Sequence, residues 1–590
     1  MLTEPEPECA EISATDDAVG TRIGTGIAVT ALALGLSACG GSDGGTSGGL
    51  PTPTPTPTPA IVITDAEAAR FLLQAQFAAL DSDISAVKTQ GYSAWLTNQL
   101  GLAASQGGWD WLTSQGIDIA HSSKGNELFF SSEIDPMVWY QLYIGADPMR
   151  KRCAIALSEM MVVSVEPAIA GKTWPQYLIA GYWDVLTANA FGNFRTLLEE
   201  VTLNPAMGIY LNTAGNLKED ASSGRQPDEN YAREVMQLFT IGLYKLNVDG
   251  TRQLDASGNP IPTYAQSDVS NLARAFTGYD IDYSKTKQVP VSYLTFTITT
   301  NEFTRGRMAF AASDHSTLAA TFLGTTIPAN TDGATALKTA LDTLFNHPNV
   351  GPFFGKQMIQ KLVTSNPSAA YVGRVAAVFN DNGAGVRGDL KAVWKAILTD
   401  TEARTLPTSS TAGKVREPAM RFVQWGRTFS ISSTSGNWKI YSQADAATLG
   451  QSWFRAPSVF NFFRPDYTPP NTAIASSGLV APEFQLHSEV STTGYLNTLT
   501  WSINATFGDA GDLKPDYSII LPLATDPTAL VNWLNLHLTA NQLSANTVSL
   551  IKASISKIVL TATSTDADKL NVIYGAVLLV MACPEYIIQK

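Results

Sequence analysis

The chain has 590 residues, of which 45% are hydrophobic and only 15% charged, and its formal net charge is -13. This length exceeds one minimal domain, so we expect one very large domain or two closely joined subdomains. The apolar fraction is ordinary, so the core should be ample and disorder limited to one end. Phosphate contacts need clustered positive charge, and this mildly acidic chain has no Lys/Arg run longer than three residues. We therefore expect no nucleic acid partner.

Residues 1–38 are typical of a signal peptide. Residues 23–38 form an uncharged, mostly apolar run, too short for a comfortable membrane span, that fits the hydrophobic region of a signal. The run ends in Leu-Ser-Ala followed by Cys39, which resembles the bacterial lipobox, whose cysteine is acylated and becomes the new N-terminus. A signal should begin with positive charge, but residues 4–17 are acidic, so we expect translation to start at Val19. The alternative is an apolar stretch buried in a domain.

A tether is predicted between this anchor and the domain. Residues 40–49 are Gly, Ser, Asp and Thr, and residues 51–59 are a strict Pro-Thr repeat. The first part is typical of a flexible linker, and the second of a stiff spacer of roughly 3 Å per residue. Residues 39–60 should therefore carry the lipidated cysteine and a spacer. This design predicts a lipid-anchored protein of the cell envelope, at the outer membrane and facing the periplasm or the surface.

Residues 61–590 are predicted to form one large, mostly α-helical domain. Thr64-Asp65-Ala66-Glu67 is a helix start, followed by an apolar face. Further helices are predicted at 148–165, 183–203, 228–244, 267–277, 334–346, 349–364, 369–380, 389–399, 415–428, 527–536, 540–561 and 566–582. Strand-like alternation is limited to residues 289–300, after a turn at 255–260. We therefore expect a small β-hairpin insertion near 245–303.

One glycine pattern suggests a cofactor site but lacks the context that such a site needs. Gly383 to Gly388 fits the dinucleotide-binding pattern, yet residues 371–380 before it are predicted to be helical, so no strand–helix unit exists to hold a pyrophosphate. A helix–loop–helix connection with Asp389 as N-cap fits better. The chain has five histidines and no metal-type cysteine spacing, which argues against a metal site. We expect neither metal nor cofactor.

A polar stripe lies on the predicted helix 228–244. Asn230, Arg233, Glu234 and Gln237 fall at i, i+3, i+4 and i+7, which places them on one face. In a charge-poor protein such a stripe faces water, lines a polar cavity, or forms buried ion pairs with other helices. We expect Arg233 and Glu234 to be buried, each meeting an opposite charge from another segment.

A second polar pair, Arg152 and Glu159, lies on an otherwise apolar helix. A helix that is hydrophobic nearly all round is buried, and its charges must then be paired, because isolated buried ions cost several kcal/mol. Asp184, Arg195 and the Arg233–Glu234 pair are the candidate partners. Acid–base sites are built from buried carboxylates with shifted pKa values. Buried ion-pair networks that have only a structural role contain the same residue types.

Three further residues stand out singly. His315 follows Asp314 in a polar loop, where it is either a proton shuttle or a solvated side chain. Cys153 and Cys583 both lie in apolar helical contexts. We expect buried free thiols, and a disulfide between them is the alternative.

Ten stretches of the chain together resemble the large bacterial family filed as domain of unknown function number 1800. The resemblance covers about residues 62–590. The stretches are Ala69–Gln74, Gly91–Leu96, Arg150–Glu159, Asn189–Arg195, Asn204–Gly208, Asn230–Gly242, Leu272–Gly278, Phe454–Arg464, Ala481–Phe484 and Met581–Tyr586.

The resemblance implies a secreted or envelope location, and often a neighbouring gene for a second exported protein of unknown function. It implies no known reaction. The family pattern near His315 has an Asp next and a Lys a few residues on, but here Ser316 replaces the Asp and residues 318–321 contain no Lys. Gln237 stands where a Glu is common. If those groups are catalytic in the family, this member is altered or inactive.

Two functions follow from these patterns. The first is a non-catalytic envelope lipoprotein that binds a partner protein or a surface polymer, with Asn230, Arg233, Arg152, Glu159 and Asp184 as binding candidates. The second is a hydrolase of envelope or extracellular polysaccharide that uses paired carboxylates, with Glu234 as acid/base and His315 as auxiliary. A cleft with two carboxyl groups about 5–10 Å apart would favour the enzyme.

Overall fold

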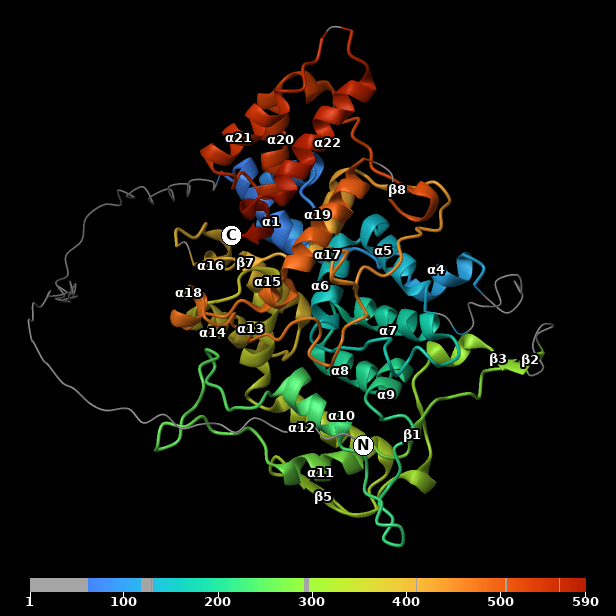
Figure 1. Ribbon diagram of the computed structural model, residues 1–590. Coiled ribbons are helices and arrows are strands. Elements are labelled where there is room, and N and C mark those ends of the chain that lie inside the picture. The colour runs from blue at the N-terminus through green and yellow to red at the C-terminus, as the bar shows by residue number, and fades with distance from the viewer. Residues whose placement is uncertain are drawn as a thin grey trace, which may run out of the picture. The chain divides into compact units, whose positions relative to one another are not determined.

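The computed structural model describes residues 62–117, 129, 131–290, 297–409, 411–504, 507–561 and 563–590. The chain divides after Ala60, and the second unit, Ile61–Lys590, carries all of the described elements (Figure 1). The predicted signal peptide, Cys39 and the predicted tether lie outside the described residues.

The unit is mostly α-helical, as the sequence predicts. Its first half contains α1 (Asp65–Ala75), α2 (Asp81–Gln90), α3 (Tyr92–Gly101), α4 (Gly108–Ser114), α5 (Ile134–Ile144), α6 (Pro148–Ser158), α7 (Pro175–Asn189), α8 (Phe194–Thr202), α9 (Pro205–Tyr210), α10 (Asn230–Glu234), the π-helix η2 (Val235–Thr240) and α11 (Gln266–Ala275). The second half contains α12 (Gly333–Asn346), α13 (Val350–Leu362), α14 (Ala369–Asn380), α15 (Leu390–Thr399), α16 (Thr401–Arg404), α17 (Pro418–Thr428), α18 (Ala473–Ser476), α19 (Glu489–Ile503), α20 (Pro527–Thr539), α21 (Ala545–Ile555), α22 (Asp566–Ala582) and α23 (Pro584–Ile587).

The strands of the described residues are short and form two-stranded antiparallel sheets. The predicted hairpin is present as β2 (Gln288–Pro290) paired with β3 (Thr297–Thr299). The other pairs are β1 (Tyr279–Asp280) with β4 (Ala309–Phe310), β5 (Ala320–Phe322) with β6 (Thr325–Ile327), β7 (Lys414–Val415) with β10 (Ile588–Gln589), and β8 (Ser432–Ser433) with β9 (Leu513–Lys514). Short 3-10 turns include η3 (Asn301–Thr304), η4 (Ala312–Asp314), η5 (Pro482–Leu486), η6 (Asp509–Gly511) and η7 (Leu521–Thr525). The β content therefore extends past the predicted insertion, with short strand pairs as far along the chain as Ile588–Gln589.

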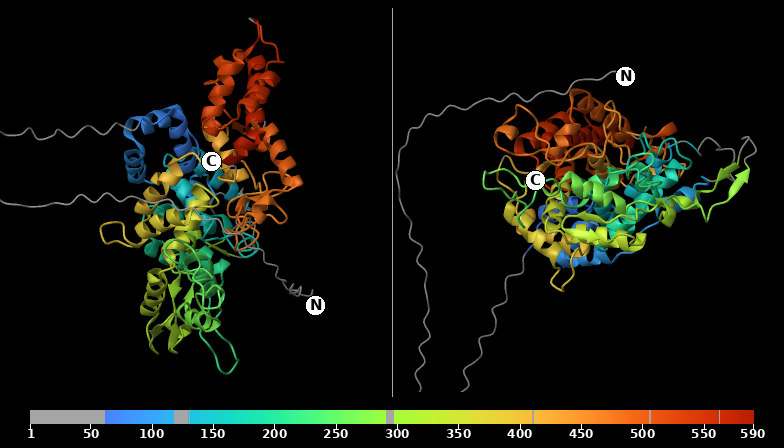
Figure 2. Two further views of the ribbon diagram at one scale, coloured as in Figure 1. Left: turned by 90° about the vertical axis from the view of Figure 1, so that its left-hand side faces the viewer. Right: turned by 90° about the horizontal axis from the view of Figure 1, so that it is seen from below.

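Segments from both ends of the domain sequence meet in space. Helix α1 packs against α20, and β7 pairs with β10 at the C-terminus, so the domain closes on itself. In both Figure 1 and Figure 2, α20, α21 and α22 lie at one end of the unit, and the segment from α10 to α12 with its small strands lies at the other. Among the described helices, none has the length and hydropathy needed to cross a bilayer.

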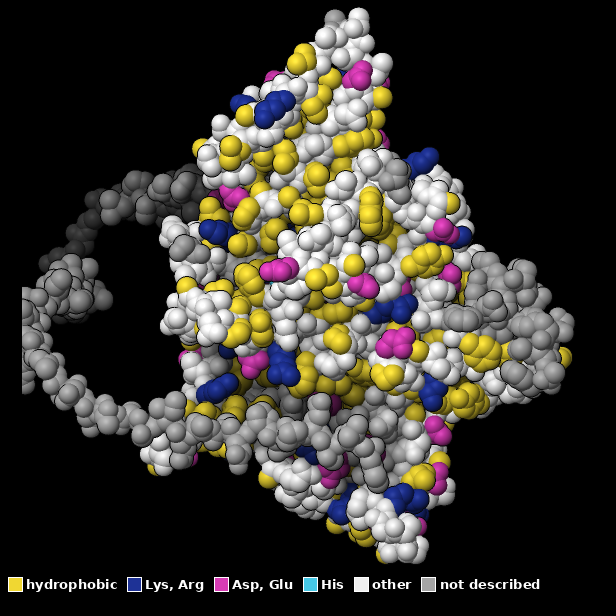
Figure 3. Space-filling model, viewed as in Figure 1, with side chains coloured by type: hydrophobic (Ala, Val, Ile, Leu, Met, Phe, Trp, Pro, Cys, Tyr) yellow, Lys and Arg dark blue, Asp and Glu magenta, His cyan; other side chains and the backbone are white. Residues whose placement is uncertain are grey.

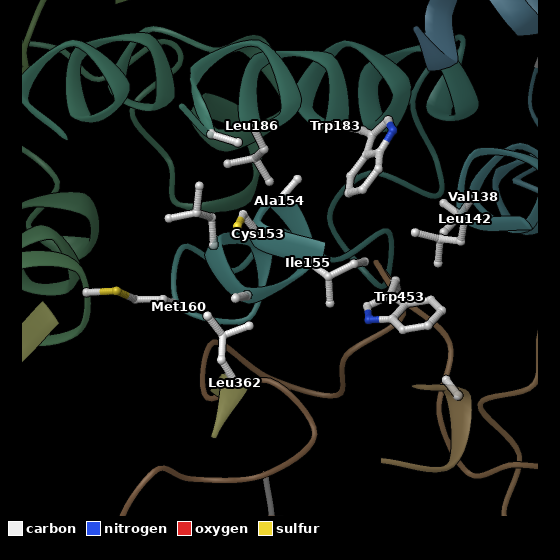
Figure 4. Packing of buried hydrophobic residues seen from close by; sticks show 14 of the residues in the cluster. Val138, Leu142, Cys153, Ala154, Ile155, Met160, Trp183, Leu186, Leu362 and Trp453 are labelled. Carbon is white, nitrogen blue, oxygen red and sulfur yellow. The ribbon is translucent and has the colours of Figure 1, made fainter. Parts of the chain in front are cut away.

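The core is organised around α6, whose residues from Met149 to Ser158 are all buried. Figure 4 shows Cys153 and Ile155 of this helix between the side chains of Trp183 and Leu186, which come from α7, and that of Leu362, which ends α13. A helix surrounded in this way explains why its apolar residues are not confined to one face. Its three consecutive basic residues are nevertheless buried as well.

Several predicted helices differ from the structure. The predicted helix 148–165 ends at Ser158, and the predicted helix 228–244 consists of α10 and the π-helix η2. The predicted helix 183–203 is two helices, α7 and α8, because the chain between them pairs with a distant loop. The backbone N–H of Phe194 donates to the carbonyl of Gly388 (2.8 Å), and that of Leu390 donates to the carbonyl of Gly192 (3.0 Å). The predicted helix 540–561 begins only at Ala545, because the two residues before it that carry positive φ, Ala540 and Asn541, cannot continue a helix.

Candidate functional site

Six buried charged side chains from four separate segments gather around the C-terminal end of α6, and we call them the core ionic cluster. The cluster combines three carboxyl groups with three cations, so its charge is balanced when all six are ionised. Its members are Arg152, Glu159, Lys361, Lys414, Glu417 and Glu483.

Direct ion pairs connect this cluster. The carboxylate of Glu159 lies 3.1 Å from Nζ of Lys361 on α13, and that of Glu483 lies 3.0 Å from Nζ of Lys414. All four side chains are at most 7% exposed. Buried ions are tolerated only when they are paired and hydrogen-bonded, so each of these pairs depends on both of its members. The expectation that Glu159 is buried and paired is confirmed, but its partner is Lys361 and none of the candidates named from the sequence.

Two cations of the cluster donate hydrogen bonds to the backbone carbonyl oxygen of Lys361. It accepts a hydrogen bond from Nη2 of Arg152 (2.7 Å) and another from Nζ of Lys414 (2.8 Å). Lys361 lies in the last turn of α13, whose final carbonyls have no partner within the helix and carry the negative end of its dipole. The two cations therefore satisfy the end of the helix and hold α6 and β7 against it.

Two carboxyl groups of the cluster are coupled. Burial, followed by the negative charge of Glu159, raises the pKa of Glu417 to about 8. Burial also raises the pKa of Glu159, but Lys361, Arg152 and a hydrogen bond with Glu417 outweigh it, so its pKa lies below the ordinary value. At neutral pH, Glu417 is therefore the protonated partner and Glu159 the ionised one. Gln451, fully buried, donates to the other side of Glu417 (2.5 Å).

The cavity that Glu417 lines is small. A cavity of about 20 Å³ is lined by Arg152, Lys414, Glu417 and their neighbours. This is about the space that one water molecule occupies, so the cavity has no room for a sugar ring. The residue types of the cluster resemble those of an acid–base site, but the cavity that Glu417 lines is too small for a substrate of that size.

Sequence reasoning finds only part of this cluster. Arg152 and Glu159 are identified from the apolar helix around them, but four members are missed: Lys361, Glu483, Lys414 and Glu417. A signal for the last two is present, because residues 414–417 place three charges immediately before a helix-starting proline in a charge-poor chain. The charged groups that face them, Glu483 and Glu159, lie more than 50 positions away, and no local pattern indicates those.

Glu234, the leading candidate acid, is buried but has no ion-pair partner among the described residues. Its side chain is 8% exposed, and its Oε2 makes no hydrogen bond. Burial raises the pKa of Glu234, and only the charge of Arg233 opposes this effect. The expectation that an opposite charge from another segment meets Glu234 is wrong. The reason is that the expected partners, Arg152 and Arg195, bind elsewhere: Arg195 contacts Glu199 and Asp342.

Arg233 differs from the expectation too. Its side chain is 38% exposed and pairs with Glu229 on its own helical turn (3.1 Å), with a further bond to Gln266. Asn230 is half-buried and begins α10, where its backbone N–H donates to Asp228 (2.8 Å). The predicted stripe does not continue, because the chain after Glu234 is a π-helix. The wider turn of the π-helix moves Gln237 off the face that an α-helix would give it. In its actual position, Gln237 accepts a hydrogen bond from Tyr264.

His315 is buried, not solvated. It is 6% exposed, its Nδ1 lies 2.9 Å from the carbonyl oxygen of Thr277, and its ring meets Phe310 edge-on. Gly278 allows this close packing, since a Cβ there would lie 2.8 Å from the carbonyl oxygen of Ala311. The neighbouring Ser316, which replaces the family's Asp, donates to the carboxylate of Glu219 (2.8 Å). No contact described for His315 involves Glu234.

Asp184 has a structural role that the sequence does not indicate. Its two carboxylate oxygens accept the backbone N–H groups of Gly108 (2.6 Å) and Trp109 (3.0 Å), so it caps the first turn of α4 from a different helix. Burial raises the pKa of Asp184, although these two bonds oppose the rise. A Cβ on Gly107 would come within 2.8 Å of the carboxylate, which explains the glycine there.

Comparison with known families covers nearly all of this domain. The model of a family described as a protein of unknown function, DUF1800, matches residues 70–588. The chain belongs to this family. Comparison with curated proteins and with solved structures found no significant match. The match to the DUF1800 model includes every segment that supplies the core ionic cluster and Glu234.

In this DUF1800 member, the described residues contain no group of three His, Cys, Asp or Glu side chains placed to hold a metal ion. Cys153 and Cys583 are both free, the first buried and the second partly exposed. Burial raises the pKa of Cys153 to about 12, so this thiol stays protonated. The expectation of a buried free thiol is confirmed for Cys153, whereas Cys583 is free but only partly buried.

Proposed function

We propose that this chain is an exported lipoprotein of the cell envelope, anchored in the outer membrane through an acyl chain on Cys39, and that its helical domain binds a partner protein or a surface polymer. The signal-like run before Cys39 and the Pro-Thr spacer after it support the anchor. A partner protein would fit the second exported protein that the family resemblance implies.

One observation favours binding over catalysis. Glu417, one of the two interacting carboxyl groups of the core ionic cluster, lines a cavity of only about 20 Å³, and Glu159 does not line it. A glycoside hydrolase needs its two carboxyl groups to flank the scissile bond of a bound sugar. Here the pair serves the packing of α6, α13 and α17 instead, and it gives the binding domain a fixed shape.

The anchor is tested by metabolic labelling with an alkyne fatty acid, followed by separation of membrane and soluble fractions. Wild-type protein should be labelled and remain with the outer membrane. Cys39→Ala should lose the label and appear in the soluble fraction, whereas the control Cys583→Ala should behave as wild type. A Cys39→Ala protein that stays labelled and membrane-bound would overturn the anchor.

Binding and catalysis are separated by one assay with isolated envelope polysaccharide. The mature protein should sediment with the polymer, or with the purified protein that a neighbouring gene encodes. It should not release new reducing ends from the polymer. Release of reducing ends in proportion to protein concentration would overturn the non-catalytic proposal.

A polysaccharide hydrolase is the second candidate, and Glu234 is the observation that favours it. A buried carboxyl group without a partner and with a raised pKa has the properties of a general acid. If reducing ends are released, Glu234→Gln should lower the rate by at least about 100-fold, as expected for loss of general acid catalysis. An unchanged rate would exclude Glu234 as the acid.

A further inference from the structure

A polar groove lies on the domain between α12 and β6. Its volume is about 480 Å³, within the roughly 300–1,000 Å³ that is usual for ligand sites. Six of its eight lining residues are polar, whereas ligand pockets are predominantly apolar. The polar residues are Thr325, Thr339, Asp342, Thr343, Asn346 and His347. We call this the α12 groove.

The side chains that line the α12 groove include both hydrogen-bond donors and hydrogen-bond acceptors. The hydroxyl of Thr339 donates to the carbonyl of Thr335 (2.8 Å) and that of Thr343 to the carbonyl of Thr339 (2.8 Å). The hydroxyl of Thr343 also hydrogen-bonds that of Thr325 (3.2 Å), which lines the groove too. The lone pairs of the Thr339 oxygen and one lone pair of the Thr343 oxygen therefore remain as acceptors. Asn346 is exposed and offers an amide, which both donates and accepts.

His347 adds a donor. Its Nδ1 accepts the backbone N–H of Asn349 (3.2 Å), so in the neutral ring the proton is on Nε2. Burial, and after it the positive charges of Lys245 and Arg387, lower the pKa of His347 to about 4. The ring is therefore neutral at physiological pH and serves as a fixed N–H donor.

The charge of the groove is compensated. The carboxylate of Asp342 lies 2.7 Å from Nε of Arg195 and 2.5 Å from Nζ of Lys338, so its negative charge is balanced by two cations. Neither cation lines the groove itself. Lys245 and Arg387, whose positive charges act on His347, do not line the groove either, so no lining residue offers a positive charge to an anionic ligand. A cation would compete with two existing ion pairs. On the face that Figure 3 shows, acidic and basic side chains are likewise interspersed.

We propose that the α12 groove binds a segment of a neutral, hydroxyl-rich polysaccharide. A row of mixed donors and acceptors without net charge matches the hydroxyl groups of a neutral sugar. A protein partner would call for the aromatic and apolar anchors that dominate interface energies, and among the groove's eight lining residues only Leu323 and Pro348 are apolar. This inference rests on the proposed function, because it selects the polymer as the bound partner.

The test is calorimetric titration of the mature chain with two neutral hexasaccharides, cellohexaose and maltohexaose, and with one acidic oligomer, hexagalacturonate. At least one neutral probe should bind, and the acidic one should bind at least tenfold more weakly. Thr343→Val keeps the side-chain shape without its hydroxyl, and Asn346→Ala removes the amide. Each should weaken binding about tenfold. Asn497→Ala, which removes an exposed asparagine from α19, should change nothing.

The possible outcomes differ in what they overturn. Binding of neither neutral probe, or preference for the acidic one, would overturn the saccharide inference, and the protein-binding form of the proposed function would stand. Neutral sugar binding that Thr343→Val and Asn346→Ala leave unchanged would overturn the groove but keep polymer binding. Thermal unfolding of each variant shows whether a lost affinity is due to lost folding.

Discussion

The carboxylate of Glu159 and the ammonium group of Lys361 lie 3.1 Å apart in the interior of the domain, and both side chains are almost fully excluded from water. The pair joins the end of α6 to the last turn of α13. Because the carbonyl of the same lysine also accepts hydrogen bonds from Arg152 and Lys414, this one position ties three segments together. The stability of the domain should depend strongly on it.

The first prediction concerns this pair. Glu159→Gln should lower the free energy of unfolding by about 3–5 kcal/mol, because it leaves the buried ammonium of Lys361 without its counter-charge. Asp566→Asn, which breaks the exposed pair of Asp566 with Lys569, is the control and should cost about 0–1 kcal/mol. The measurement is urea denaturation of the mature chain. Equal losses in the two variants would show that the buried pair is not required.

The second prediction is a pH dependence caused by Glu417. Its pKa of about 8 in the folded protein lies above its ordinary value of 4.5, so between these two pH values the folded state binds more protons than the unfolded state. Stability from this group is complete at low pH and is lost as pH rises through about 8. Each unit of pKa difference corresponds to about 1.4 kcal/mol.

Glu417→Gln mimics the protonated form and should remove this loss. The unfolding free energy of the wild type should therefore fall more steeply between pH 5 and pH 9 than that of the variant. Glu159 does not contribute in this window, since its lowered pKa affects stability only at acidic pH. Parallel curves for the two proteins would refute a shifted Glu417.

The third prediction concerns Glu234. A buried carboxylate without a partner is unfavourable, so Glu234→Gln should cost less than about 1 kcal/mol, or stabilise the protein, at pH 8. Because burial raises its pKa, the wild type loses stability as pH rises and the variant does not. The variant's advantage should therefore be larger at pH 8 than at pH 5. A loss of about 3–5 kcal/mol would instead mean that a counter-charge does bind this carboxylate.

The fourth prediction tests the cap that Asp184 provides for α4. Asp184→Ala should cost about 1–3 kcal/mol, because two buried backbone N–H groups lose their acceptor. Asp184→Asn keeps one acceptor oxygen and should cost less. Both values come from urea denaturation, and earlier proteolysis within α4 (Gly108–Ser114) should accompany the alanine variant. If alanine and asparagine are equivalent, the cap does not stabilise the helix.

Local sequence signals correctly predict where some of the helices begin. The predicted start at Thr64 is a true capping box, in which Thr64 and Glu67 each bond the other's backbone N–H. The predicted N-cap Asp389 accepts the N–H groups of Lys391 and Ala392, which confirms that the glycine pattern before it is a helix–helix connection. Such signals act over three or four residues, so they hold wherever the helix is placed in the fold.

The ion-pair and hydrogen-bond partners of the charged side chains depend on the tertiary structure. The sequence indicated that Arg152 and Glu159 are buried, but their cluster includes Lys361, 202 positions from Glu159, and Glu483, which is further still along the chain. Likewise, Glu234 proved unpaired and His315 buried. Burial depends on which helices pack together, and the free energy of an ion pair depends on distance and on exclusion of water. Neither quantity is fixed by residues that are neighbours in sequence.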